Sequence, residues 1–348
     1  MRKIFLFNAV ICAALSVSFF SITANASPND ENIPSTIESF IECTDLGTSY
    51  TVRDLYSYDG SLTATCLEFE SCGYLIYDTN SVVIEFSETA SSPYYDCDQI
   101  CYYAGPLSYY VKANNGKYED INSNELLFDY EFENMSECYE EKIGTIDNEY
   151  ETYSLYSDNS SNHQMFTVGE LPHSTRLLDY NNSGACGSLA ATIMMCYYHD
   201  YINSNYLYSK YSDNDYNLYQ FLIDYIETSY SEGGGETTGS NIYSLAYGLQ
   251  AAMPKISSRS NVNVTYQKDA YDNIWSRVTA QIVAKKTPSC LSIHSHPIYG
   301  NHWVVAIGST QLIVNGSVSH KYFVVNDGWG NNNIKIISSF SNGVVYIQ

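Results

Sequence analysis

The sequence predicts an α+β fold, in which a helical half is followed by an antiparallel sheet and a β-rich segment precedes both. Three observations support this prediction. Short apolar and tyrosine-rich runs fill residues 27–140, helical spacing dominates residues 186–285, and strand-like runs follow Pro288. The chain has 348 residues, 45% of them hydrophobic, which is enough for two domains with substantial cores.

Residues 1–26 have the pattern of a secretory signal peptide. Arg2 and Lys3 precede an almost uninterrupted apolar run over residues 4–22, and Ala24-Asn25-Ala26 supplies a small-x-small cleavage site. We expect a secreted protein without membrane contact after cleavage, because no second apolar run approaches the roughly 18 residues needed to span a bilayer. An uncleaved membrane anchor is the alternative.

Residues 27–140 are expected to form a disulfide-bearing β domain. Residues 73–78 and 81–87 indicate a hairpin, and residues 107–111 a further strand. Six cysteines in an exported segment predict up to three disulfides, with the pairing left open. They are Cys43, Cys66, Cys72, Cys97, Cys101 and Cys138. Half a metal site at Cys97 and Cys101 is the weaker alternative, because no histidine neighbours them.

Residues 141–168 are expected to be an exposed acidic linker, because they are rich in polar residues and lack helical periodicity. The pattern of residues 169–348 is that of a second domain. Helices are expected at 186–201, 241–252 and 272–285, and strands at 289–294, 303–307 and 322–326. Asn315-Gly316 predicts a tight hairpin turn between the last two strands.

The chain is strongly acidic, with a formal net charge of −23. Such a surface repels the phosphates of nucleic acids and anionic membranes, so we expect neither as a partner. The expected oligomeric state is a monomer.

Cys186 is the candidate nucleophile. It opens an apolar helix, where free backbone N–H groups stabilise a thiolate, and the neighbouring Gly184 and Gly187 leave room for a substrate backbone. The second half holds an odd number of cysteines, so one thiol is left over. A buried structural cysteine is the alternative, and Cys196 fits that description better.

His302 is the candidate general base, because imidazole titrates near neutrality and this residue stands where a glycine turn enters an apolar strand. His294 and His296 on the preceding strand are the runners-up. Counting back from a two-residue turn at Asn315-Gly316, His302 opposes Trp329.

The same register places Asp327 on the face of His302, one diagonal step away, while Asn326 points to the other face. Asp327 is therefore expected to hold the imidazole in one tautomer. Trp329 would shield that hydrogen bond from water.

Two segments resemble those of a known family. Cys186-Gly187-Ser188 is similar to the nucleophile segment of papain-like cysteine peptidases, and Asp327-Gly328-Trp329-Gly330 resembles their Asn-Ser-Trp-Gly segment, with Asp for Asn. The ordered set of motifs is similar to the bacterial branch, which includes bacteriocin-leader peptidases and streptopain-like secreted peptidases. The resemblance covers residues 169–348.

The resemblance implies a papain-like domain that hydrolyses peptide bonds in peptide or protein substrates, without a metal or organic cofactor. It assigns Cys186 as nucleophile, His302 as general base and then acid, and Asp327 as the orienting residue. Tyr180 stands where the family has its oxyanion glutamine, so Asn182 or Asn181 could supply the amide beside the Cys186 N–H.

The resemblance also suggests that residues 27–140 form a prodomain that covers the cleft until the linker is cut. A permanent accessory or adhesion domain is the alternative. Two other functions remain open: the same triad could serve an amide or isopeptide transferase or a cell-wall amidase, or the chain could be a catalytically inactive secreted binding protein.

Overall fold

The computed structural model describes residues 33–154, 162–180, 185–228, 241–259, 261–268, 270–296 and 300–348. The predicted signal peptide, residues 1–26, lies outside the described residues. The described chain combines α-helices with a large sheet that is antiparallel except where β1 meets β5, so the predicted α+β class is confirmed. No helix in this part of the chain is both long and apolar enough to cross a membrane.

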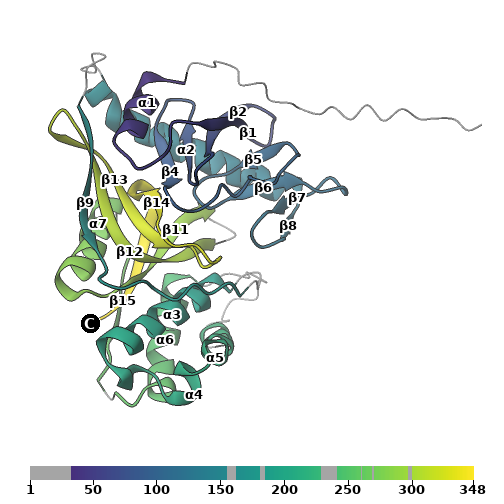
Figure 1. Cartoon of the computed structure of the whole chain (residues 1–348). Coiled ribbons are helices and arrows are strands. Elements are labelled where there is room, and N and C mark those ends of the chain that lie inside the picture. The colour runs from purple at the N-terminus through teal and green to yellow at the C-terminus, as the bar shows by residue number, and fades with distance from the viewer. Residues whose placement is uncertain are drawn as a thin grey trace, which may run out of the picture. The chain divides into compact units, whose positions relative to one another are not determined.

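The strands of the described residues belong to one sheet, in the order β10-β15-β11-β12-β13-β14-β4-β3-β2-β1-β5-β6-β7-β8, with β9 beside β12 (Figure 1). The earlier strands are β1 (Tyr50–Tyr56), β2 (Leu62–Phe69), β3 (Tyr74–Asp78), β4 (Val83–Ser87), β5 (Cys101–Tyr103), β6 (Tyr109–Lys112), β7 (Tyr118–Asp120) and β8 (Leu126–Leu127). The later strands are β9 (His163–Glu170), β10 (Val264–Lys268), β11 (Ser289–His296), β12 (Gly300–Val314), β13 (Ser317–Asn326), β14 (Ile334–Ile337) and β15 (Ser341–Ile347).

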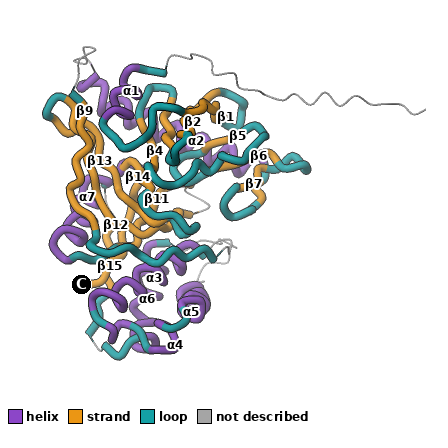
Figure 2. The backbone as a smooth tube through the Cα atoms, in the orientation of Figure 1, coloured by secondary structure: helices purple, strands orange, loops and turns teal. Residues whose placement is uncertain are grey.

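Helices α3 to α6 gather in one group beside the sheet (Figure 2). The α-helices are α1 (Ser35–Glu42), α2 (Asp129–Ser154), α3 (Cys186–Tyr197), α4 (Ser209–Ser212), α5 (Asp215–Thr228), α6 (Ile242–Ile256) and α7 (Tyr271–Ala280). Single π-turns follow α3 and α7, at Tyr198–Ile202 and Gln281–Lys285. Helix α3 is buried on all sides after its first residue, because its sequence is apolar all round.

The N-terminal strands continue the C-terminal sheet. Strands β3 and β4 pair antiparallel, so the hairpin predicted at residues 73–87 is confirmed. On its other side β4 pairs with β14, where Phe86 lies opposite Lys335 and Glu85 opposite Ile336. One backbone ladder therefore joins the two halves of the chain.

Side chains reinforce this junction. The ring of Phe86 in β4 lies 5.0 Å from that of Phe40 in α1 and 5.5 Å from that of Tyr322 in β13. The Tyr322 hydroxyl donates a hydrogen bond to the Val83 carbonyl at 3.2 Å. Apolar residues of both halves thus share one core, and residues 33–348 form one unit.

The expected linker at residues 141–168 is corrected by the structure. Residues 141–154 continue α2, and residues 163–168 lie in β9, which pairs with the long strand β12. The residues between, 155–161, lie outside the described part. Helix α2 has a buried stripe at helical spacing, which its acidic and tyrosine-rich composition concealed: Phe132, Met135, Tyr139, Ile143 and Ile146.

Strands β12 and β13 form the hairpin predicted at Asn315-Gly316. Both turn residues have positive φ, 52° and 81°, as a two-residue turn of this kind requires. One extra residue in β13 shifts the pairing, and one extra residue in β12, Ile307, shifts it back. Because the two bulges cancel, Val305 faces Asn326 in the predicted register.

The cysteines differ from expectation. All nine that the structure describes are free thiols, so it contains none of the disulfides expected among the six N-terminal cysteines. Cys66 contacts the Ser92 hydroxyl, and Cys72 donates to the carbonyl of Glu88. Cys97 and Cys101 approach each other, with their Sγ atoms 3.5 Å apart.

Candidate active site

Cys186 is the first residue of α3, and its thiol lies against strand β12. Burial raises the pKa of this thiol, while hydrogen bonds to the backbone of Trp303, Gly187 and Cys186 itself lower it. Trp303 directly follows His302. The helix start therefore supplies the expected stabilisation of a thiolate, but desolvation outweighs it and the thiol is protonated at about pH 7.

His302 is held on two sides. Its ring stacks flat on Trp329, with the ring centroids 4.2 Å apart and the planes at 6°, so the predicted neighbourhood of these two residues is confirmed. The backbone carbonyl of Asp327 accepts a hydrogen bond from the ring. Nε2 is buried without a hydrogen-bond partner among the described residues, so the bonded nitrogen is Nδ1.

The Asp327 carboxylate has a different task from the one expected. Oδ1 accepts hydrogen bonds from the backbone N–H groups of Trp329 (2.8 Å) and Asn331 (3.0 Å), and Oδ2 accepts from the Asn331 amide (2.8 Å). Strand β13 ends at Asn326, and Asp327 begins a tight turn whose N–H groups need an acceptor. The carboxylate therefore shapes the turn, and the backbone carbonyl bonds the imidazole.

Glycine lets this turn approach helix α3. Gly328 has φ +79°, and a Cβ built on it would lie 3.3 Å from Leu189 Cδ2. The Asn326 amide donates hydrogen bonds to the Thr175 hydroxyl at 3.0 Å and to the Arg176 carbonyl at 3.1 Å, which agrees with the expectation that Asn326 faces away from His302. The turn after β13 is thus fixed between α3 and the segment that precedes Cys186.

The segment before Cys186 runs beside the same turn, because Asp179 forms a bridge with Trp329. Tyr180, at the position of the family's glutamine, donates its hydroxyl to Asp215 of α5 and is thereby held. Asn181 and Asn182, the candidates for the oxyanion amide, lie outside the described residues. The runners-up His294 and His296 lie on β11, next to β12.

Cys186 and His302, the candidate nucleophile and base, are both neutral near pH 7. Burial lowers the pKa of His302 from 6.5 to about 4, although the hydrogen bond to the Asp327 carbonyl raises it. With Nδ1 carrying the proton, the lone pair is on the buried Nε2. The site can therefore accept a proton at Nε2, but it does not store a thiolate–imidazolium pair at rest.

The N-terminal half contributes charge to this site, which the sequence analysis missed. The Glu125 carboxylate, just before β8, raises the pKa of Cys186. Glu85 of β4 is fully buried, and its charge interacts with that of Asp327. A signal for Glu85 was available: it is the single acid in the apolar run Val82-Val83-Ile84-Glu85-Phe86.

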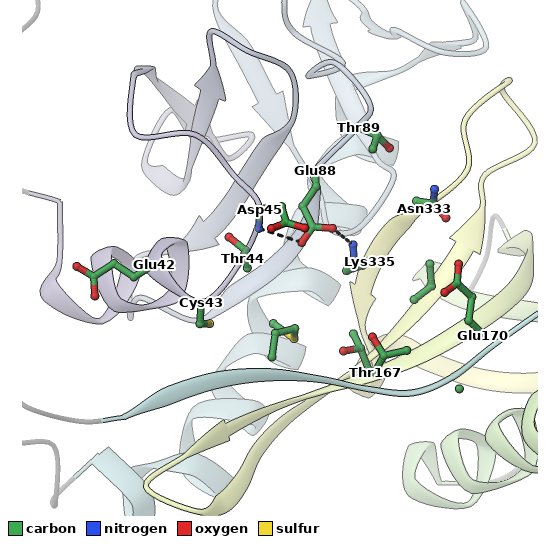
Figure 3. A pocket seen from close by; sticks show the side chains of 14 residues that line it. Glu42, Cys43, Thr44, Asp45, Glu88, Thr89, Thr167, Glu170, Asn333 and Lys335 are labelled. Atoms are coloured by element: carbon green, nitrogen blue, oxygen red, sulfur yellow. Dashed lines mark hydrogen bonds and ion pairs between the residues drawn. The ribbon is translucent and has the colours of Figure 1, made fainter.

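A cavity of about 510 Å³ lies elsewhere, between α1 and strands β9 and β14 (Figure 3). Its lining is acidic, and its lysine, Lys335, is paired with Glu88. It reaches β12 at Thr310, seven residues from Trp303 and so about 20 Å along the strand. It is a separate feature from the site around Cys186. Among the described residues, no three His, Cys, Asp or Glu side chains are grouped to hold a metal ion.

Comparison with known proteins does not add to this picture. No model of a known protein family matches the chain, and no curated protein matches it in sequence.

Proposed function

We propose that the chain is a secreted cysteine peptidase with a papain-like domain, in which Cys186 is the nucleophile and His302 the base. The observation that carries this proposal is the state of His302. Trp329 and the Asp327 carbonyl hold its ring, while Nε2 has no hydrogen-bond partner among the described residues. The Cys186 thiol bonds to the backbone of the residue after His302, Trp303. The arrangement of a nucleophile on a helix start and a base on an adjoining sheet supports the papain-like fold.

The proposed reaction begins with a neutral pair. His302 Nε2 takes the thiol proton as Cys186 Sγ attacks the peptide carbonyl, and backbone N–H groups at the start of α3 face the oxyanion, with Asn182 as a further donor. The intermediate collapses to an acyl-thioester when Nε2 gives its proton to the leaving amine. Water then attacks the thioester, loses a proton to Nε2 and releases the acid, which restores the thiol.

Asp327 and Trp329 have positioning roles in this proposal. The Asp327 carbonyl holds the Nδ1–H tautomer, and the flat stack on Trp329 restricts rotation of the ring. A hydrogen bond to a neutral carbonyl stabilises the imidazolium less than one to a carboxylate would. A modest thiol reactivity at rest is therefore expected, rising when substrate orders the site.

The test is covalent labelling of the full chain with a limiting amount of an epoxysuccinyl thiol inhibitor, followed by peptide mapping. We expect one adduct at Cys186, absent from Cys186→Ala and strongly reduced in His302→Gln. His320→Gln is the matched control, because burial also lowers the pKa of that histidine to about 4 at a position away from the site. Thermal unfolding of each variant excludes misfolding as the cause.

Other outcomes would favour the rival functions. Equal labelling of the His302→Gln variant and the wild type would refute the proposed base. Lack of labelling at Cys186 would favour an inactive binding protein, which the raised pKa of this thiol supports. If labelled protein forms but product appears only when an added amine accepts the acyl group, the activity is amide transfer.

The zymogen hypothesis is supported by one electrostatic effect: the charge of Glu125, in the N-terminal half, raises the pKa of Cys186, although burial raises it more. Activity measured before and after cleavage at an engineered protease site between residues 155 and 161 tests it. A large increase would support masking of the site, whereas equal activity would show that residues 27–140 are a permanent accessory segment. Intact mass of the exported protein tests removal of residues 1–26.

A further inference from the structure

Two cysteines of the N-terminal half lie close together at the start of β5. The Sγ atoms of Cys97 and Cys101 are 3.5 Å apart, and both thiols approach the carbonyl oxygen of Gln99, at 3.8 and 3.5 Å. The short loop between them therefore already brings both side chains to one point. A disulfide needs an S–S distance of about 2 Å, so closure requires a movement of about 1.5 Å.

Arg53 of β1 holds this loop in place. Its Nη1 atom donates to the Cys97 carbonyl at 2.7 Å and lies 3.8 Å from Cys101 Sγ. The same guanidinium is paired with Glu68 of β2 at 3.2 Å, so it is fixed to the sheet. Burial and the neighbouring Cys97 raise the pKa of the Cys101 thiol to about 12, and the positive charge of Arg53 partly offsets this rise. Cys101 must therefore lose its proton when it attacks, because the thiolate is the form that attacks a disulfide.

The two thiols differ in access. Cys97 is half-buried, whereas Cys101 is only 2% exposed. An external reagent therefore meets Cys97 first, and Cys101 is placed behind it as the resolving thiol. The other N-terminal thiols with a described contact do not face a second thiol. Cys43 donates to the Phe40 carbonyl, Cys66 contacts the Ser92 hydroxyl, and Cys72 donates to the Glu88 carbonyl.

We propose that Cys97 and Cys101 form a disulfide when the protein meets an oxidising disulfide of low molecular weight, such as oxidised glutathione. Cys97 attacks one sulfur of the reagent and displaces one thiolate. Cys101 then attacks Cys97 Sγ and displaces the second thiolate. The two protein thiols are oxidised, the reagent is reduced to two thiols, and these take the two protons released.

The bond would fasten the loop onto the start of β5. This short strand, only Cys101–Tyr103, pairs with β1 in the parallel direction, at Leu55 and Tyr56. Oxidation in the cell depends on the proposed secretion. The chemical step itself does not, and it is independent of any role of Cys186.

The test uses the full-length protein, reduced and then equilibrated with oxidised glutathione, alkylated and digested without reductant. Cleavage before Asp98, which lies between the two cysteines, places them on separate fragments. We expect one linked pair of fragments, about 2 Da lighter than the sum of the two free-thiol fragments. In Cys101→Ser we expect glutathione to remain on Cys97, because the resolving thiol is missing.

Cys72→Ser is the matched control, since Cys72 is exposed and lies outside the pair. It should leave the linkage unchanged. Recovery of Cys97 and Cys101 as separate alkylated fragments at every glutathione ratio would overturn the proposal. Linkage of Cys97 to any other cysteine, or stable glutathione on Cys97 in the wild type, would overturn it as well.

Discussion

Replacing Glu85 by glutamine should remove a pH dependence of stability that the wild-type protein carries. The Glu85 side chain is fully buried and accepts hydrogen bonds from the Tyr74 and Tyr109 hydroxyls and from the Leu107 N–H. Burial raises the pKa of this carboxyl from 4.5 to about 7, and the negative charge of Asp327 adds to the rise. No positively charged side chain of the described residues is among the main groups that shift this pKa.

The sign follows from proton binding. Above about pH 4.5 the unfolded chain releases this proton, whereas the folded protein keeps it until about pH 7. The contribution of Glu85 to stability is therefore greatest below pH 4.5 and is lost as the pH rises through 7. At about 1.4 kcal/mol per pKa unit, the whole effect is about 3 kcal/mol, of which about 2 kcal/mol falls between about pH 5 and pH 8.

Urea unfolding at about pH 5 and pH 8 measures this effect. Glutamine can retain the contacts, with its carbonyl oxygen facing the Leu107 N–H and its amide facing the tyrosine hydroxyls, which rotate to accept. We expect Glu85→Gln to be less stable than wild type at the lower pH, and to lose that deficit or reverse it at the higher pH. Glu70→Gln, at an exposed position, is the control. An unchanged difference between wild type and Glu85→Gln at the two pH values would refute the reasoning.

Three further predictions concern the turn after β13 and the junction of the halves. Gly328→Ala should lower the free energy of unfolding by about 1–3 kcal/mol and lower activity, because this residue has a positive φ and lies close to α3. Gly116→Ala is the control: its φ is also positive, +85°, but the space around it is open, so urea unfolding should show a smaller loss. Asp327→Asn should lower kcat/KM less than tenfold, because the backbone carbonyl bonds His302; a loss near 10⁴-fold, about what a triad carboxylate would give, would contradict this. Phe86→Ala should lower the free energy of unfolding by about 3–5 kcal/mol, because the ring is fully buried, and the protein should still unfold in one cooperative transition. Two separate transitions would show that the halves unfold independently.

The junction of the halves bears on how the protein could be activated. Strands β4 and β14 pair, and Lys335 forms an ion pair with Glu88 across the same boundary. A chain cut between residues 155 and 161 would keep these contacts. Activation by cleavage would therefore leave two associated pieces unless the N-terminal half also unfolds or is degraded.

Local sequence was sufficient for the elements that depend on neighbouring residues. The Asn315-Gly316 turn, the hairpin of β3 and β4 and the helix that opens at Cys186 were all predictable, because φ preferences and the spacing of apolar residues are properties of a short stretch. Hairpin counting also placed His302 beside Trp329. The predicted register holds up to the last pair, Val305 and Asn326, because the two bulges compensate, which no local pattern indicated.

The remaining features depend on contacts between residues far apart in the chain. The pairing of β4 with β14 joins residues about 250 positions apart. The His302 ring donates its hydrogen bond to the Asp327 carbonyl because β13 ends just before Asp327, and the Asp327 carboxylate is occupied by N–H groups of the following turn. The pKa values of Cys186 and His302 were likewise set by burial in the assembled core. Sequence thus determined which residues are candidates for a reaction, while long-range packing determined their charge and their partners.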